Sequence, residues 1–84
     1  MLESSAHESA SPDPARVLSP RETEVLDLAS LGLTNAQIAL RLCVTVHAVK
    51  FHLAAIYRKL EVSNRTTAVG LYLRSLQERI TETP

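Results

Sequence analysis

From Ser19 onward, apolar residues recur at the three- and four-residue spacing of helices, and short polar clusters interrupt this pattern three times. Each run begins after a residue that favours a helix N-terminus. Ser19 and Thr34 are each followed three residues later by Glu or Gln, the signature of a capping box. Thr45 and Ser63–Asn64 precede the last two runs. The pattern therefore predicts four helices, at about 20–31, 35–42, 46–60 and 65–79.

The second and third predicted helices are joined by only three residues, Cys43 to Thr45. Gly32, after the first helix, favours a left-handed chain reversal. A short helix, a tight turn and a longer helix are typical of a helix-turn-helix, in which the second helix of the pair enters the major groove of DNA. We expect 46–60 to be that recognition helix.

On a helical wheel, residues 46–60 divide into two faces. Val49, Leu53, Ile56 and Leu60 form an apolar stripe, which we expect to face the core. Phe51 lies on the opposite side. Its outward-facing neighbours are predicted to be His47, Lys50, Ala54, Ala55 and Arg58. A solvated face would not ordinarily carry a bulky aromatic residue at its centre.

Composition narrows the function. The 84 residues suffice for one small domain, and few aromatic residues or helix breakers favour an all-α fold. Cys43 is the single cysteine, which excludes an internal disulfide, and three scattered histidines leave no metal cluster. No signal sequence or membrane span is evident, so a cytoplasmic protein is expected. Without a catalytic constellation or phosphate loop, we predict neither an enzyme nor a cofactor.

Charge is distributed unevenly, although the formal net charge is zero. Residues 34–74 contain six basic residues and one acid, Glu61, a local net charge of +5. Residues 1–17, rich in Ser, Ala, Pro and acid, are predicted to be a disordered tail or linker, and 81–84 a second tail. The domain is expected to span 18–80 and to favour an anionic partner.

The outward residues of 46–60 suit the edges of DNA bases. Lys50 can donate to guanine O6 or N7 or to a phosphate, while Phe51 and Ala54 can pack against thymine methyl groups. The predicted base contacts are His47, Lys50, Phe51 and Ala54. Basic side chains and helix N-termini suit phosphates. The predicted phosphate contacts are Thr34, Asn35, Arg41, Thr45, Arg58, Lys59 and Arg65.

Four motifs occur in order: LSPRETEVL from Leu18, GLTNAQIA from Gly32, AVKFH from Ala48 and KLEVSNRTTAV from Lys59. With them the chain resembles the LuxR/FixJ-type, GerE-like family of bacterial transcription regulators. The resemblance implies a tetrahelical domain with its helix-turn-helix at about 35–54, sequence-specific binding of double-stranded DNA, and base contacts by Lys50 and Phe51. Ala48 replaces the Thr usual in the family, and Ala54 stands where some relatives carry a basic residue.

The family resemblance also implies a homodimer on an inverted repeat. An apolar stripe in the fourth predicted helix suits that role, although it could instead complete the core. The stripe consists of Val69, Leu73, Leu76 and Ile80.

Several alternatives remain open at this stage. Phe51 could bind a protein partner or pack under the tail, and the basic residues could form a solvated face. His52 is interpreted as a packed, hydrogen-bonded histidine, and Cys43 as a small apolar structural residue. The alternative function is a protein-interaction module that docks on RNA polymerase or another regulator through the same face. Steep salt dependence would favour DNA.

Overall fold

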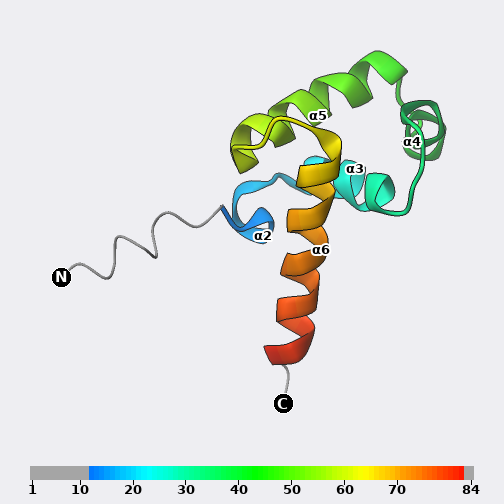
Figure 1. Ribbon diagram of the computed structural model, residues 1–84. Coiled ribbons are helices and arrows are strands. Elements are labelled where there is room, and N and C mark those ends of the chain that lie inside the picture. Colours follow the sequence, from blue (N-terminus) through cyan, green and yellow to red (C-terminus); the bar gives the residue numbers. More distant parts are fainter. Residues whose placement is uncertain (1–11, 83–84) are drawn as a thin grey trace.

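The computed structural model describes residues 12–82, with side chains placed to Ile80. This part of the chain is helical and contains no strand, which confirms the all-α prediction (Figure 1). The helices are α2 (Pro14–Val17), α3 (Pro20–Ser30), α4 (Asn35–Leu42), α5 (Val46–Leu60) and α6 (Arg65–Glu82). The last four correspond to the predicted helices. Helix α6 continues to Glu82, past the predicted end at about residue 79.

Side-chain caps fix where the main helices begin, as the sequence predicted. In α3, the Glu22 N–H donates to Ser19 Oγ at 3.1 Å and the Ser19 N–H donates to Glu22 Oε1 at 2.9 Å. Thr34 and Gln37 form the same box in α4. Thr45 caps α5 through the Ala48 N–H at 3.0 Å. Each such cap typically stabilises its helix by about 1 kcal/mol.

Residues 14–17 differ from the prediction of a disordered tail, because they form α2. Asp13 caps this helix and Pro14 occupies its first turn. A single helical turn is not stable alone, because nucleation fixes several backbone angles for very few hydrogen bonds. Packing supplies the rest: Pro14 is buried, and the Ser75 hydroxyl on α6 donates to Asp13 Oδ1 at 3.3 Å. Residues 1–11 of the predicted tail lie outside the described residues, and the 18–80 domain boundaries stay a prediction.

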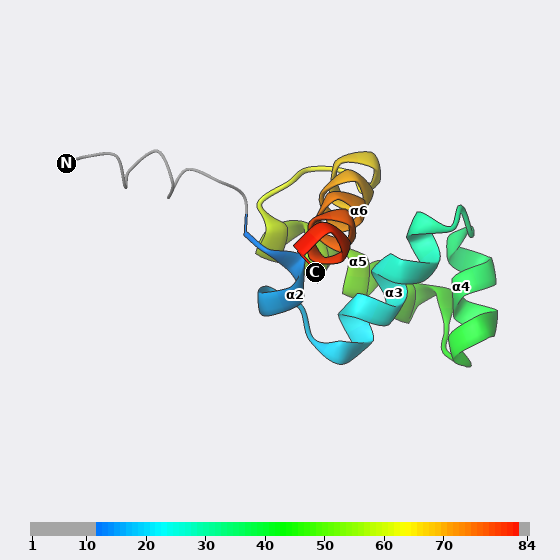
Figure 2. The same ribbon diagram turned by 90° about the horizontal axis from the view of Figure 1, so that it is seen from below.

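The core lies where α3, α4 and α6 pack around α5. Figures 1 and 2 both place α3 between α4 and α6, and in Figure 2 α6 is seen nearly end-on. The largest fully buried side chains come from α3, α4 and α5. They are Val25, Leu26, Ile38, Val49, Ile56 and Leu60.

Among the described residues, no single helix is long and apolar enough to cross a membrane. Only α4 and α5 together pass that test, on length and composition, and they are bent by 107° at the turn between them.

Candidate nucleic-acid interface

Helices α4 and α5 form a helix-turn-helix. Their 107° bend falls within the range of about 90–120° that is typical of the motif. Cys43 makes the reversal by adopting a left-handed backbone with φ of 59°, and the Val44 N–H then donates to the Ala39 carbonyl at 3.0 Å. The predicted apolar structural role of Cys43 is wrong, because this residue is exposed at the turn and does not pack in the core.

The structure confirms that α5 has an apolar inward face and a polar outward face. Val49, Leu53, Ile56 and Leu60 are buried. On the other face Phe51 is 68% exposed. All four residues predicted to contact bases are exposed on this helix, namely His47, Lys50, Phe51 and Ala54.

Ala55, predicted to face outward, is buried. It lies one turn before Lys59, whose side chain contacts Glu22 at the start of α3. Residues four apart share a helix face, so Ala55 belongs to the flank of α5 that α3 covers. The helical wheel gave Ala55 the correct angular position on α5. It does not show that another helix covers that flank.

Two aromatic rings meet at the edge of the outward face. The Phe51 and His52 ring centroids lie 5.9 Å apart, with the rings inclined by 71°, an edge-to-face arrangement. His52 is half-buried, in keeping with its predicted packed position, but its side chain forms no hydrogen bond to the described residues. This contact favours one orientation of the exposed Phe51 ring.

Lys59 is tied to the fold by an ion pair. Its Nζ lies 2.8 Å from Glu22 Oε1 and 3.1 Å from Oε2. Burial raises the pKa of Glu22, but hydrogen bonds from Lys59 and the Ser19 N–H, together with the Lys59 charge, outweigh it and leave the pKa below its ordinary value. The pair therefore braces the end of α5 against the start of α3. A phosphate contact by Lys59 stays a prediction.

Arg65 and Asn35, both predicted phosphate contacts, are brought together although they are 30 residues apart. Arg65 Nη1 donates to Asn35 Oδ1 at 2.8 Å, and Nη2 donates to the Leu33 carbonyl. The guanidinium thus lies at the beginning of α4. Neither partner carries a charge, so the positive charge of Arg65 is not neutralised there.

The remaining predicted cations are exposed. Within residues 12–82, the side chains of Arg41, Lys50 and Arg58 form no ion pair or hydrogen bond. The hydroxyls of Thr34 and Thr45 accept capping hydrogen bonds and each keep a proton to donate. The exposed cations on α4 and α5 are therefore available to an anion.

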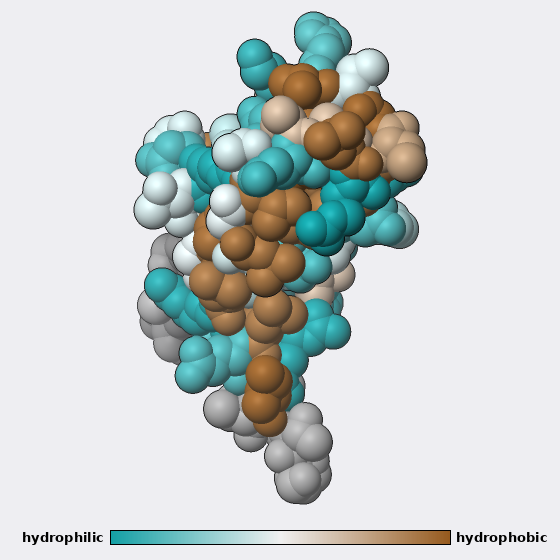
Figure 3. Space-filling model, turned by 90° about the vertical axis from the view of Figure 1, so that its right-hand side faces the viewer, coloured by the Kyte–Doolittle hydropathy of each residue, from teal (hydrophilic) through white to brown (hydrophobic). Residues whose placement is uncertain are grey.

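The apolar stripe of α6 is partly covered. Val69 and Leu76 are half-buried and pack against the core, whereas Leu73 and Ile80 are 46% and 71% exposed. Figure 3 shows the resulting apolar band along the helix. The stripe thus contributes to the core, as one alternative held, and also leaves apolar surface uncovered.

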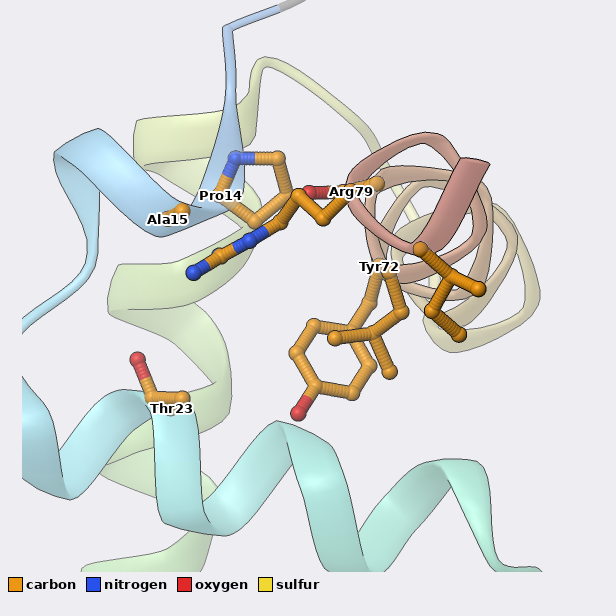
Figure 4. A pocket seen from close by; sticks show the side chains of 8 residues that line it. Pro14, Ala15, Thr23, Tyr72 and Arg79 are labelled. Carbon is orange, nitrogen blue, oxygen red and sulfur yellow. The ribbon is translucent and has the colours of Figure 1, made fainter. Parts of the chain in front are cut away.

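A hollow of about 390 Å³ lies beside this stripe, between α2, α3 and α6. Its walls include Pro14, Leu76 and Ile80, and Figure 4 shows Tyr72 with its hydroxyl directed toward α3. That hydroxyl donates to Asp27 Oδ1 at 2.9 Å. Burial and the carboxylate raise the pKa of Tyr72 to about 12 against the opposing charge of Arg79, so the phenol stays protonated as the donor.

Sequence reasoning missed the ionic role of Glu22 and the hydrogen bond of Tyr72. Glu22 had a visible role as a cap residue, but its lysine lies 37 residues away. Tyr72 and Asp27 are 45 residues apart. No local pattern links either pair.

Within the described residues, no group of three or more His, Cys, Asp or Glu side chains is placed to hold a metal ion.

Comparison with known proteins agrees with this geometry. The family profile described as bacterial regulatory proteins, luxR family, matches residues 16–72. The chain is 49% identical over 53 residues to the quorum sensing-dependent transcriptional regulator RpaR of Rhodopseudomonas palustris, covering 63% of this chain and 22% of RpaR. It is 42% identical over 65 residues to the nitrate/nitrite response regulator protein NarP of Escherichia coli, covering 77% of this chain and 30% of NarP.

Among solved structures, the response regulator ChrA of a heme-sensing two-component system superposes with a TM-score of 0.66 and 42% identity, over 76% of this chain and 30% of that one. RpaR is a transcriptional regulator, NarP and ChrA are response regulators, and none of the three is named as an enzyme. This chain spans less than a third of the length of each. The match covers more than half of the 84 residues and includes the whole helix-turn-helix. The chain belongs to the luxR family of bacterial regulatory proteins.

Proposed function

We propose that this domain binds double-stranded DNA sequence-specifically, with α5 in the major groove, and thereby regulates transcription in the bacterial cytoplasm. One observation carries the proposal: the outward face of α5, directly after the helix-turn-helix bend, combines a largely exposed Phe51 with exposed cations. An aromatic residue at the centre of a basic surface suits the major groove, where apolar methyl groups lie among hydrogen-bond acceptors.

The N-terminal half of α5 supplies the base contacts in this proposal. Lys50 donates to guanine O6 or N7, and Phe51 and Ala54 contact thymine methyl groups. His47 lies one turn before Phe51 on the same face and reaches a neighbouring base pair. Specificity then depends on four side chains that contribute nothing to the buried core.

Phosphate contacts orient the domain. Arg41 and Arg58 are exposed cations, and Thr34, Asn35 and Thr45 lie at helix N-termini, whose dipoles favour anions. Lys59 and Arg65 are already engaged within the fold. Their direct share of phosphate binding is therefore expected to be smaller than that of Arg41 and Arg58.

Two copies joined through α6 would read an inverted repeat. The exposed residues Leu73 and Ile80, with Val69 and Leu76, offer an apolar strip to a second α6. In a symmetric dimer the two recognition helices would lie about one helical turn of DNA apart. Sedimentation with and without a duplex tests this assembly, and a concentration-independent monomer bound singly to a palindromic site would contradict it.

A second candidate function is docking on RNA polymerase or another regulator, here through the end of α3 and α4 rather than through the α5 face expected from the sequence. Leu31 and Leu40 are 66% and 81% exposed, and Leu40 borders a shallow surface hollow with Gly32, Gln37 and Arg41. Exposed apolar side chains of this kind often mark protein contacts. Leu40→Gln, which adds no charge beside Arg41, should then leave the affinity for DNA intact while reducing transcription in a reconstituted assay.

The decisive experiment is a titration by fluorescence anisotropy. A duplex selected from a random library and a scrambled duplex are compared at two salt concentrations, using the wild-type chain, Lys50→Ala, Phe51→Ala and, as a matched control, Arg16→Ala on α2. We expect salt-sensitive binding with a sequence preference that is lost in the two α5 variants and kept in Arg16→Ala. Absence of salt-sensitive binding to any duplex would contradict DNA binding and favour a protein partner.

A further inference from the structure

Arg65 occupies the first position of α6, yet its side chain ends at the first turn of α4. It donates from one nitrogen to the Asn35 side chain and from the other to the Leu33 carbonyl in the α3–α4 turn. These bonds span 30 and 32 residues of sequence and are partly buried. Arg65 therefore connects the helix proposed for dimerisation directly to the first helix of the helix-turn-helix.

We infer that Arg65 is a positioning residue for DNA recognition: its guanidinium fixes the start of α4, and through it the helix-turn-helix, relative to α6. This inference rests on the proposed function. In a dimer joined by α6, the distance and angle between the two recognition helices depend on how rigidly each helix-turn-helix is attached to α6. Side-chain bonds from α6 to the start of α4 add to the packing of α6 against α5 in that attachment.

The geometry of the partners favours arginine specifically. A guanidinium presents several donors in a rigid plane, so two of its nitrogens can reach two separate oxygens at once. One of those oxygens is the Leu33 backbone carbonyl in the turn between α3 and α4. The hydrogen bond from Arg65 therefore also fixes the path of that turn. A lysine ammonium is a point charge on a flexible stem and would not hold both oxygens in the same way.

The competing explanation is that Arg65 serves as a direct phosphate contact. Its partners are neutral, so its charge remains available. The two roles make different predictions for Arg65→Lys, which keeps the charge but loses the fork. A phosphate contact survives that change with little loss of affinity. A positioning residue does not.

The test uses the whole chain with the selected and scrambled duplexes over a range of salt concentrations. For Arg65→Lys we expect the preference for the selected duplex to fall about tenfold with an unchanged salt slope, since hydrogen bonds from a charged group are lost but no charge is removed. Asn35→Ala should lower the same preference, and the double variant should cost less than the sum of the two single changes. Arg16→Lys, on α2 and outside the proposed interface, is the matched control and should behave like the wild type.

A second readout does not depend on DNA. Amide ¹H–¹⁵N spectra of free Arg65→Lys should show shifts concentrated in residues 33–42, with the core of α3 unchanged; shifts confined to the neighbours of residue 65 would overturn the inference. So would wild-type sequence preference in Arg65→Lys, or Arg65→Ala weakening both duplexes equally with a salt slope lower by about one, the signature of a phosphate contact. If the wild-type chain itself shows no sequence preference, the proposed function fails instead.

Discussion

The two faces of α5 share one backbone but differ in burial and in the chemistry of their side chains. The inward face consists of aliphatic residues that are almost completely buried, such as Ile56 and Leu60. The outward face carries Lys50, Phe51 and Arg58 in solvent. Burying a side chain of this size typically gains about 1.5–3 kcal/mol, and Phe51 largely forgoes that gain. One face therefore determines whether the domain folds, and the other can be changed with little effect on folding.

A narrow border separates these faces. Ala55 and Lys59 lie on the flank that α3 covers, and His52 meets Phe51 at the rim. Changes at the border are expected to affect stability and recognition together. Substitutions on the inward face and on the outward face test whether folding and recognition are separate.

The largest expected effect is on the inward face. Ile56→Ala should lower the free energy of unfolding by about 2–5 kcal/mol, because a fully buried side chain leaves a cavity. Urea denaturation followed by circular dichroism measures this loss. The exposed neighbour Ala54 provides the control, since Ala54→Ser should change stability by less than about 0.5 kcal/mol. A loss below 1 kcal/mol for Ile56→Ala would contradict the assigned core.

The outward face should respond in the opposite way. Phe51→Ala should leave the free energy of unfolding within about 0.5 kcal/mol of the wild type, while lowering the affinity for the selected duplex by about 1–3 kcal/mol. Anisotropy and urea denaturation on the same samples separate the two quantities. Phe51→Leu, which keeps an apolar contact, should recover part of the affinity. A large loss of stability in Phe51→Ala would instead make Phe51 part of the packed core.

These two faces, apart from Ala55, and the starts of the four predicted helices were predictable because their signals are local. A capping box such as Thr34 with Gln37 spans four residues, and the period of α5 repeats within its 15 residues. The helix-turn-helix follows from the turn length between two such helices. The outward position of Phe51 needed no knowledge of the rest of the chain.

The remaining features depend on residues far apart in sequence. Helix α2 forms because Pro14 and Asp13 pack against α6, and four residues alone carry no helical period. The engagement of Arg65 depends on the path of the α3–α4 turn. The sequence pattern assigns charged residues to helices, but it does not show which of them already form bonds within the folded domain.

The ion pair between Glu22 and Lys59 predicts that the stability of the domain depends on pH. Because the folded-state pKa of Glu22 lies below its ordinary value of 4.5, its contribution to stability is present above about pH 4.5 and is lost as the pH falls through the folded-state pKa. Glu22→Gln keeps a cap acceptor but removes the charge, and should cost about 1–2 kcal/mol at pH 7. Urea denaturation of both proteins between pH 7 and about pH 3 should show their curves converging toward acid. A constant difference would indicate packing rather than the ion pair.

The smallest expected effect distinguishes two adjacent cations, Arg58 on the outward face and Lys59 in the ion pair. Arg58→Ala should reduce the slope of log K against log salt by about one, and weaken binding to every sequence alike, if Arg58 contacts a phosphate. Lys59→Ala should change that slope less, because Glu22 already neutralises its charge, but should lower the free energy of unfolding, which Arg58→Ala should not. Equal slope changes in the two variants would mean that DNA draws Lys59 away from Glu22, and the border would then belong to the binding face.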